Sequence, residues 1–166
     1  MKRIAIYLAV LLISVNILYP QPPQGRTFGF GLILGEPLGA TAKIWTSRTN
    51  AIALAIGGSY YGSPRIGADY LWHFNAFNTP VVNLYAGPGI VLGFGEYRSG
   101  WWYKKDKFYY PDENRSLGVA VRGVMGINVV PRNTPIEIFL EAAPLISISP
   151  RSFSAFDLAL GIRFYP

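Results

Sequence analysis

From residue 27 onward, the chain alternates between large apolar residues and small or polar ones. The most regular stretch is residues 156–165, where large apolar side chains fill every second position from Phe156 to Phe164. A period of two predicts a strand with two chemically different faces. The residues between them are small or charged, so they cannot form a hydrophobic core, and the broad apolar face has no obvious partner within the protein. Large apolar groups outside and small polar groups inside are typical of a barrel wall in lipid.

Seven further alternating segments precede this one and are separated by turn-forming residues. We expect strands at residues 27–35, 40–45, 51–60, 65–74, 81–95, 117–129, from 136 onward, and 156–165. Pro88 cannot donate a ladder hydrogen bond, so a bulge or bend is expected there, and Pro144 leaves the register beyond it open. An even count suits a closed antiparallel barrel. The predicted fold is all-β: an eight-stranded antiparallel up-and-down transmembrane β-barrel.

The connections and the aromatic residues fit one orientation of such a barrel. The only long connection is residues 96–115, and outer-membrane barrels keep their long loops on the outside. With the N-terminus in the periplasm, aromatic residues gather at both ends of the strands. Those at the inner end are Phe28, Phe30, Trp72, Phe74 and Phe164, and those at the outer end are Tyr60, Phe94, Tyr97, Trp101 and Trp102. This distribution predicts two aromatic girdles.

The N-terminal segment predicts export. Lys2 and Arg3 precede an apolar run over residues 4–18, which is followed by the helix breakers of residues 19–23. This arrangement indicates a secretory signal peptide, because a membrane anchor requires about 20 apolar residues. The predicted organisation is a signal peptide at residues 1–22, with its cleavage position left open between 18 and 26, and a barrel at residues 23–166. An uncleaved anchor is the alternative.

Composition removes some classes of function. The chain has no cysteine, which excludes disulfides and thiolate metal sites. The formal net charge of +6 falls by two when Lys2 and Arg3 are removed, and no clustered basic face of a nucleic-acid binder is present. No apolar segment after the signal reaches helix-spanning length without Gly, Pro or charge. A membrane-bound mature chain must therefore cross with strands, since only helices and closed barrels satisfy the backbone in lipid.

Four stretches carry a resemblance to known proteins. They are residues 29–45 (GFGLILGEPLGATAKIW), 68–74 (ADYLWHF), 139–144 (FLEAAP) and 161–165 (GIRFY). On these residues the mature chain resembles a family of small, functionally uncharacterised outer-membrane β-barrel proteins, similar in size to the OmpX and OmpA membrane domains. The closing apolar strand with its terminal aromatic also resembles the C-terminal signal of outer-membrane barrels. The resemblance implies a fold and a location in the bacterial outer membrane, and no activity.

Charged residues are predicted to fill the barrel interior. The inward positions hold Lys43, Arg65, Arg122 and Arg163 together with Asp69, Glu137, Glu141 and Asp157. Equal numbers of cations and anions favour a paired structural network, because an eight-stranded interior has room only for side chains. A hairpin centred near Pro150 would place Glu137 opposite Arg163, and we expect them to form an ion pair. Glu137 and Glu141 are also candidates for acid–base chemistry, but the surrounding cations favour the structural role.

Other candidate catalytic and binding features are weaker. His73 is predicted to face inward near the periplasmic end, and a lone histidine is not a metal site. Barrel enzymes that deacylate lipid A use an outward His and a nearby Ser, whereas Asn75 follows here and no serine is placed to match. Gly29, Gly31 and Gly35 lack the spacing and the helix of a dinucleotide loop, so they are interpreted as inward glycines. We expect neither catalytic activity nor a cofactor.

The long loop is the one surface feature with distinctive chemistry. Its candidate ligand-binding residues are Trp101, Trp102, Tyr103, Lys104, Lys105 and Lys107. They form either an interfacial girdle with a solvated tip or a contact site for anionic lipid headgroups or an external ligand.

The leading hypothesis is a small bacterial outer-membrane barrel with a structural or surface-interaction role. Its partners would be outer-membrane lipids, including lipopolysaccharide, and an external partner that the sequence does not identify. Nucleic acid is not expected, and the protein is expected to be a monomer. The alternatives are a lipid-modifying enzyme similar to lipid A deacylases and a soluble lipocalin-like carrier, which would need apolar residues inside. A transport pore conflicts with the strand number.

Overall fold

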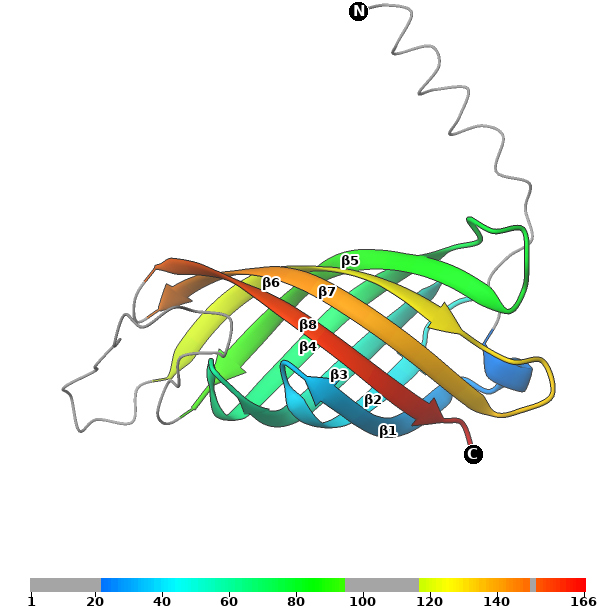
Figure 1. Cartoon of the computed structure of the whole chain (residues 1–166), viewed down its shortest axis with the longest axis horizontal. Coiled ribbons are helices and arrows are strands. Elements are labelled where there is room, and N and C mark those ends of the chain that lie inside the picture. Colours follow the sequence, from blue (N-terminus) through cyan, green and yellow to red (C-terminus); the bar gives the residue numbers. More distant parts are fainter. Residues whose placement is uncertain (1–21, 95–116, 150–151) are drawn as a thin grey trace, which may run out of the picture.

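A computed structural model describes residues 22–94, 117–149 and 152–166, which form a closed antiparallel barrel in which each strand pairs with the next and β8 pairs with β1 (Figure 1). The strands are β1 (Phe28–Gly35), β2 (Leu38–Trp45), β3 (Asn50–Ser59), β4 (Gly62–Phe74), β5 (Val82–Gly93), β6 (Gly118–Val129), β7 (Ile136–Ser149) and β8 (Phe153–Phe164). A short 3-10 turn, Pro23–Gly25, precedes β1. The predicted eight-stranded up-and-down barrel is confirmed. In the part of the chain described here, no helix has both the length and the apolar character needed to cross a membrane.

Four strands begin earlier than the sequence pattern predicted: β2 and β3 by one or two residues, and β4 and β8 by three. β4 begins at Gly62 and includes Pro64, where a turn was expected. Pro64 fits because the ladder uses its carbonyl oxygen, which accepts a hydrogen bond from Phe94 N at 3.0 Å, and needs no N–H there. β8 begins at Phe153, which pairs with Ser147 of β7. β7 continues through Pro144, which lies opposite Phe156, so this proline does not disturb the β7–β8 register.

A bulge or bend was expected at Pro88, and no bulge occurs there. β5 pairs with β6 in one register, and Pro88 lies opposite Gly123. Pairing with β4 stops after Asp69↔Gly89 and resumes in the same register at Trp72↔Ala86. Pro88 therefore interrupts one ladder without inserting a residue. The register shifts of the described strands lie instead at residues 57–59 between β3 and β4 and at residues 119–120 between β6 and β7.

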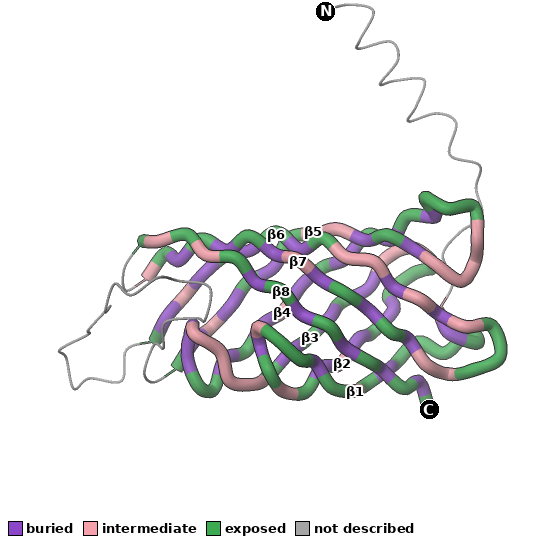
Figure 2. Tube along the Cα trace, viewed as in Figure 1, coloured by how far each residue is buried: buried purple, intermediate pink, exposed green. Residues whose placement is uncertain are grey.

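The two faces of the wall differ as the alternation predicted. Buried and exposed residues alternate along the strands (Figure 2). Most of the large apolar residues that point outward are exposed, up to 61% for Leu32, whereas the buried positions include lysine, arginine, aspartate and glutamate side chains. This is the reverse of a water-soluble domain, in which an exposed apolar surface of this extent is rare.

Aromatic rings inside the barrel lie against glycines of the neighbouring strands. A Cβ atom on Gly126 would lie 2.3 Å from the ring of Tyr85, and one on Gly161 would lie 2.1 Å from the ring of Phe139. Both glycines pair directly with the aromatic residue that covers them. The alternation of large and small inward residues thus fills a narrow interior without overlap.

The barrel has two distinct ends. The β1–β2 and β3–β4 turns lie at one, named the loop end, and the β2–β3, β4–β5 and β6–β7 turns lie at the other with the C-terminus, named the terminal end (Figure 1). The aromatic residues expected at the terminal end are exposed on the wall: Phe28, Phe30, Trp72, Phe74 and Phe164. At the loop end Phe94 is exposed. Tyr97, Trp101 and Trp102 lie outside the described residues.

Tyr60 does not belong to an outer girdle, contrary to the prediction. Its hydroxyl points into the barrel and donates a hydrogen bond to Asp157 Oδ1 at 2.6 Å. The irregularity between Gly57 and Ser59 precedes it and breaks the alternation on which the prediction depended.

Candidate functional site

The eight charged residues predicted for the interior are all buried and form two clusters. The loop-end cluster consists of Arg65, Asp69, Arg122 and Asp157. The terminal-end cluster consists of Lys43, Glu137, Glu141 and Arg163. Each contains two cations and two carboxylates, so each is formally neutral.

In the loop-end cluster, Asp157 of β8 joins the two arginines. Arg122 donates a bidentate pair of hydrogen bonds to Asp69, from Nε to Oδ1 at 2.8 Å and from Nη2 to Oδ2 at 2.6 Å. Its Nη1 lies 3.3 Å from Asp157 Oδ2, and Arg65 Nη2 also donates to that carboxylate. Charge-assisted, bidentate contacts of this kind are the strongest hydrogen bonds between side chains. The cluster thereby connects β4, β6 and β8 across the interior.

Glu137 of β7 is the centre of the terminal-end cluster. Its Oε1 accepts hydrogen bonds from Lys43 Nζ and from Asn128 Nδ2, each at 2.7 Å. Its Oε2 accepts one from the Tyr165 hydroxyl. A fully buried carboxylate requires such compensation, because burying an unpaired charge costs several kcal/mol.

The predicted cross-strand pair of Glu137 and Arg163 is confirmed. The two residues are direct partners in the β7–β8 register, and Arg163 Nη1 lies 3.6 Å from Glu137 Oε1. Arg163 has a nearer polar partner in Thr41, whose Oγ1 lies 3.0 Å from its Nη2. Its guanidinium group also lies over the Phe139 ring, with the guanidinium carbon 3.8 Å from the ring centre. The shortest charged contact of Glu137 is therefore with Lys43, which the sequence did not predict.

His73 lies inside the terminal half of the barrel, as predicted, and is only 3% exposed. Its Nε2 lies 2.9 Å from Lys43 Nζ and its Nδ1 lies 3.1 Å from the carbonyl oxygen of Thr49. Because an ammonium group can only donate, Nε2 accepts and Nδ1 donates, which corresponds to a neutral ring. The ring also lies between Trp45 and Tyr85, at centroid distances of 4.3 and 5.2 Å. The contacts with Lys43, Thr49, Trp45 and Tyr85 fix the ring of His73 in place and indicate a structural role.

Sequence reasoning missed the neutral side chains that hydrogen-bond to the two clusters. Thr41, Asn128 and Tyr165 occupy inward positions of the alternation, so parity alone indicated where their side chains point. It did not indicate that they hydrogen-bond the charged groups. Tyr60 gave no usable signal, because it follows the irregularity in β3.

One carboxyl lies at the edge of the loop end. Glu36, in the β1–β2 turn, is half-buried, and its Oε2 accepts a hydrogen bond from the backbone N–H of Tyr60 at 3.2 Å. Burial raises the pKa of Glu36, and this hydrogen bond opposes the increase. The candidate residues of the long loop, Trp101, Trp102, Tyr103, Lys104, Lys105 and Lys107, lie outside the described residues.

The charged side chains in the interior neutralise one another. Every carboxylate in the two clusters has a cationic nitrogen within 4.0 Å. Within the described ranges, no group of three or more metal-ligating side chains comes together. Paired and buried carboxylates are poorly suited to exchange protons with a substrate, since they are held by their partners and have no access to it.

Comparison with models of protein families, with curated proteins and with solved structures finds no match to this chain.

Proposed function

We propose that the protein is a small β-barrel of the bacterial outer membrane with a structural or surface-interaction role. The observation that carries this proposal is the distribution of residues on the wall: large apolar side chains point outward on every strand, and charged ones point inward. In water such a surface would aggregate, whereas in a bilayer it matches its surroundings.

The lengths of the strands agree with this setting. A tilted strand needs about 9–11 residues to cross the apolar layer of a membrane. β4 has 13 residues, β5, β6 and β8 have 12, and β7 has 14. β1 and β2 are shorter, with 8 residues each, and close the barrel between longer neighbours.

The interior weighs against the two alternatives. A lipocalin-like carrier would need an apolar interior to hold its ligand, whereas the described interior holds two clusters of charged side chains. A lipid A deacylase-like enzyme would need an outward histidine, whereas the ring of His73 is buried against Lys43 and Thr49. Both observations favour a wall that interacts with lipid and an interior that keeps the barrel closed.

The proposed recognition surface is the loop at residues 96–115. Its tryptophan, tyrosine and lysine residues suit anionic lipid headgroups, lipopolysaccharide among them, or an external partner.

The proposal is tested with refolded protein in detergent and in liposomes. We expect unboiled protein to migrate differently from boiled protein on a gel, and we expect it to float with liposomes in a density gradient and to resist extraction by carbonate. Protein that stays in the soluble fraction at the bottom of the gradient would contradict a membrane location.

A shortened variant separates the barrel from the loop. Replacing residues 98–115 with a Gly-Asn turn should leave the heat-dependent shift intact, because doubling a loop's length changes its closure entropy by only about 0.6 kcal/mol. Binding to lipopolysaccharide should weaken sharply. A shortened protein that folds and binds lipopolysaccharide as before would place recognition elsewhere.

A further inference from the structure

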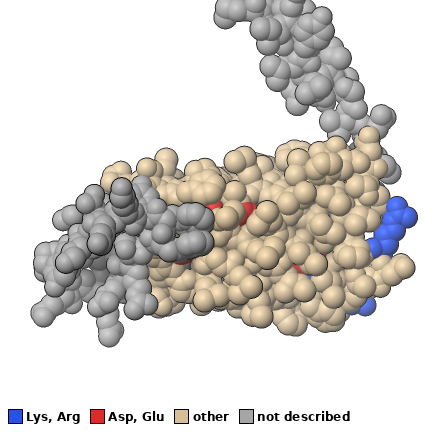
Figure 3. All heavy atoms as spheres, viewed as in Figure 1, with Lys and Arg blue, Asp and Glu red and all other residues tan. Residues whose placement is uncertain are grey.

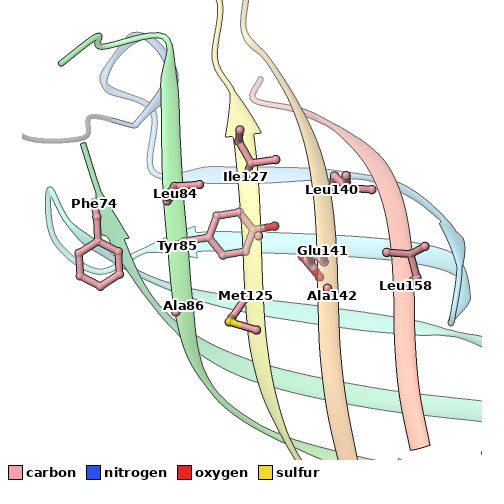
Figure 4. Close-up of a pocket in the computed structure, with 11 residues that line it drawn as sticks. Phe74, Leu84, Tyr85, Ala86, Met125, Ile127, Leu140, Glu141, Ala142 and Leu158 are labelled. Atoms are coloured by element: carbon pink, nitrogen blue, oxygen red, sulfur yellow. The ribbon is translucent and has the colours of Figure 1, made fainter. Parts of the chain in front are cut away.

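The outer wall carries an apolar groove on the side formed by β4 to β8 (Figure 4). Its volume is about 510 Å³. The outward side chains that line it include Ala86, Met125, Ile127, Leu140, Ala142 and Leu158.

The groove exists because short side chains interrupt the wall. Ala86 and Ala142 lie on either side of Met125 in adjacent strands. The next row towards the terminal end carries Ile127 and Leu140, which are direct partners and much larger. The two alanines therefore leave a hollow between bulkier neighbours, open to the surroundings of the barrel.

Exposed positive charge gathers at one end of the molecule. The exposed arginines of the described chain, Arg26, Arg48 and Arg132, all lie at the terminal end, where blue atoms are visible in Figure 3. Of the described acidic side chains, four are buried in the two clusters and the fifth, Glu36, lies at the loop end. Among the described residues, the terminal end thus presents cations and no exposed aspartate or glutamate.

Two of these arginines lie above the groove. Arg132 is in the turn between β6 and β7, two of the strands that line the groove. Arg26 Nη1 donates a hydrogen bond to the carbonyl oxygen of Tyr165 at 2.6 Å, directly beyond the end of β8. Arg48 is in the β2–β3 turn, on the opposite side of the barrel.

The distance from the terminal end of the wall to the alanines of the groove corresponds to one leaflet of a bilayer. Along β7 the path from Ile136 to Ala142 is about 20 Å at ~3.3 Å per residue. With a strand tilt of about 35–45°, this is roughly 15 Å of depth, about half of the ~25–30 Å apolar layer. A chain lying in the groove would thus begin near Arg132 and end near the middle of the bilayer.

We propose that the groove and the arginines above it bind one anionic phospholipid from the leaflet at the terminal end. An acyl chain lies across Ala86 and Ala142, and the phosphate contacts Arg132 with Arg26 beside it. A guanidinium group suits this contact because it binds phosphate oxygens through paired N–H groups. The inference rests on the proposed membrane location.

Native mass spectrometry of the refolded barrel in a non-ionic detergent tests the site. The protein is titrated with dioleoyl phosphatidylglycerol and, in parallel, with dioleoyl phosphatidylcholine. We expect one tightly retained phosphatidylglycerol and weaker retention of phosphatidylcholine. R132Q should weaken phosphatidylglycerol binding about fivefold, the loss expected for one cation at an anionic lipid surface. A142L, which fills the groove, should weaken the binding of both lipids.

Two matched variants control for general effects. R48Q removes an exposed arginine from the same end on the far side of the barrel, and A42L enlarges an outward alanine of β2 outside the groove. Neither should change lipid retention. Equal losses in R132Q and R48Q, or in A142L and A42L, would overturn the site and indicate unspecific association. In these outcomes the barrel still floats with liposomes and shifts on heating, whereas failure of both of those assays overturns the proposed membrane location itself.

Discussion

Single glycines decide how the interior of this barrel is filled. Gly126 and Gly123 lie on the same strand, three residues apart, but their surroundings are opposite. The position of a Cβ on Gly126 is occupied by the ring of Tyr85, whereas a Cβ on Gly123 would meet nothing within 4 Å. The difference follows from the alternation, since Gly126 faces inward and Gly123 faces outward.

We predict that Gly126→Ala lowers the free energy of unfolding by about 1–3 kcal/mol, because the added methyl group forces the Tyr85 ring out of its position. Gly123→Ala is the matched control and should change it by less than about 0.5 kcal/mol. Reversible urea unfolding in vesicles measures both. Equal effects of the two substitutions would show that the ring does not lie where the structure places it.

Glu137 has two cationic partners at different distances. Lys43 Nζ lies 2.7 Å from its Oε1, whereas Arg163 Nη1 lies 3.6 Å away and has Thr41 as a closer partner. Double-mutant cycles with Glu137→Gln should give a coupling of about 2–3 kcal/mol with Lys43→Met and below about 1 kcal/mol with Arg163→Met. Either single substitution at the Lys43–Glu137 pair should cost about 3–5 kcal/mol, because it leaves a buried charge. The opposite order of couplings would argue against this arrangement.

At the scale of strands, the sequence predicted register and side-chain direction correctly wherever the alternation of apolar and polar residues was unbroken. The register of β7 and β8 and the pairing of Glu137 with Arg163 follow from parity and from a hairpin near Pro150. Parity failed where the backbone departs from a regular ladder: it assigned Tyr60 to the outside because the irregularity at residues 57–59 leaves no trace in the apolar pattern. The apolar pattern also could not show whether Pro88 causes a bulge or only interrupts a ladder. Which of the two occurs depends on how the neighbouring strand β4 pairs with β5.

Outward positions on β2 and β3 can report whether lipid surrounds the wall. Leu54 lies in the middle of β3 and Ile44 lies near the terminal end of β2, and both are 41% exposed. In phospholipid vesicles, Leu54→Arg should reduce the free energy of unfolding by about 2–4 kcal/mol and Ile44→Arg by no more than about 1 kcal/mol, because the cost of a charge depends on its depth in the bilayer. Urea unfolding in vesicles measures both values. Equal, small costs at the two positions would contradict a transmembrane wall.

At the scale of the molecule, the two ends of the barrel differ, and they support one orientation in the proposed membrane. Arg48 and Arg132 lie in turns at the terminal end, whereas residues 95–116 connect strands at the loop end. With the loop end at the cell surface, trypsin applied to intact cells should cut within residues 98–107 and spare both arginines. Mass spectrometry of the fragments identifies the cleavage sites, and disrupted cells serve as the control in which Arg48 and Arg132 become accessible. Cleavage at Arg132 in intact cells would reverse the orientation.

The neutrality of the two interior clusters has a consequence for assembly. Their contacts join residues far apart in the chain: 53 positions separate Asp69 from Arg122, 92 separate Arg65 from Asp157, and 94 separate Lys43 from Glu137. No single hairpin contains both members of any of these three contacts, and charges without their partners are costly to place in an apolar environment. Closure of the last strand on the first is thus the step that completes both clusters at once. If the barrel lies in a membrane as proposed, partly assembled forms gain little from the bilayer until the barrel is closed, and we expect insertion to be a single cooperative event.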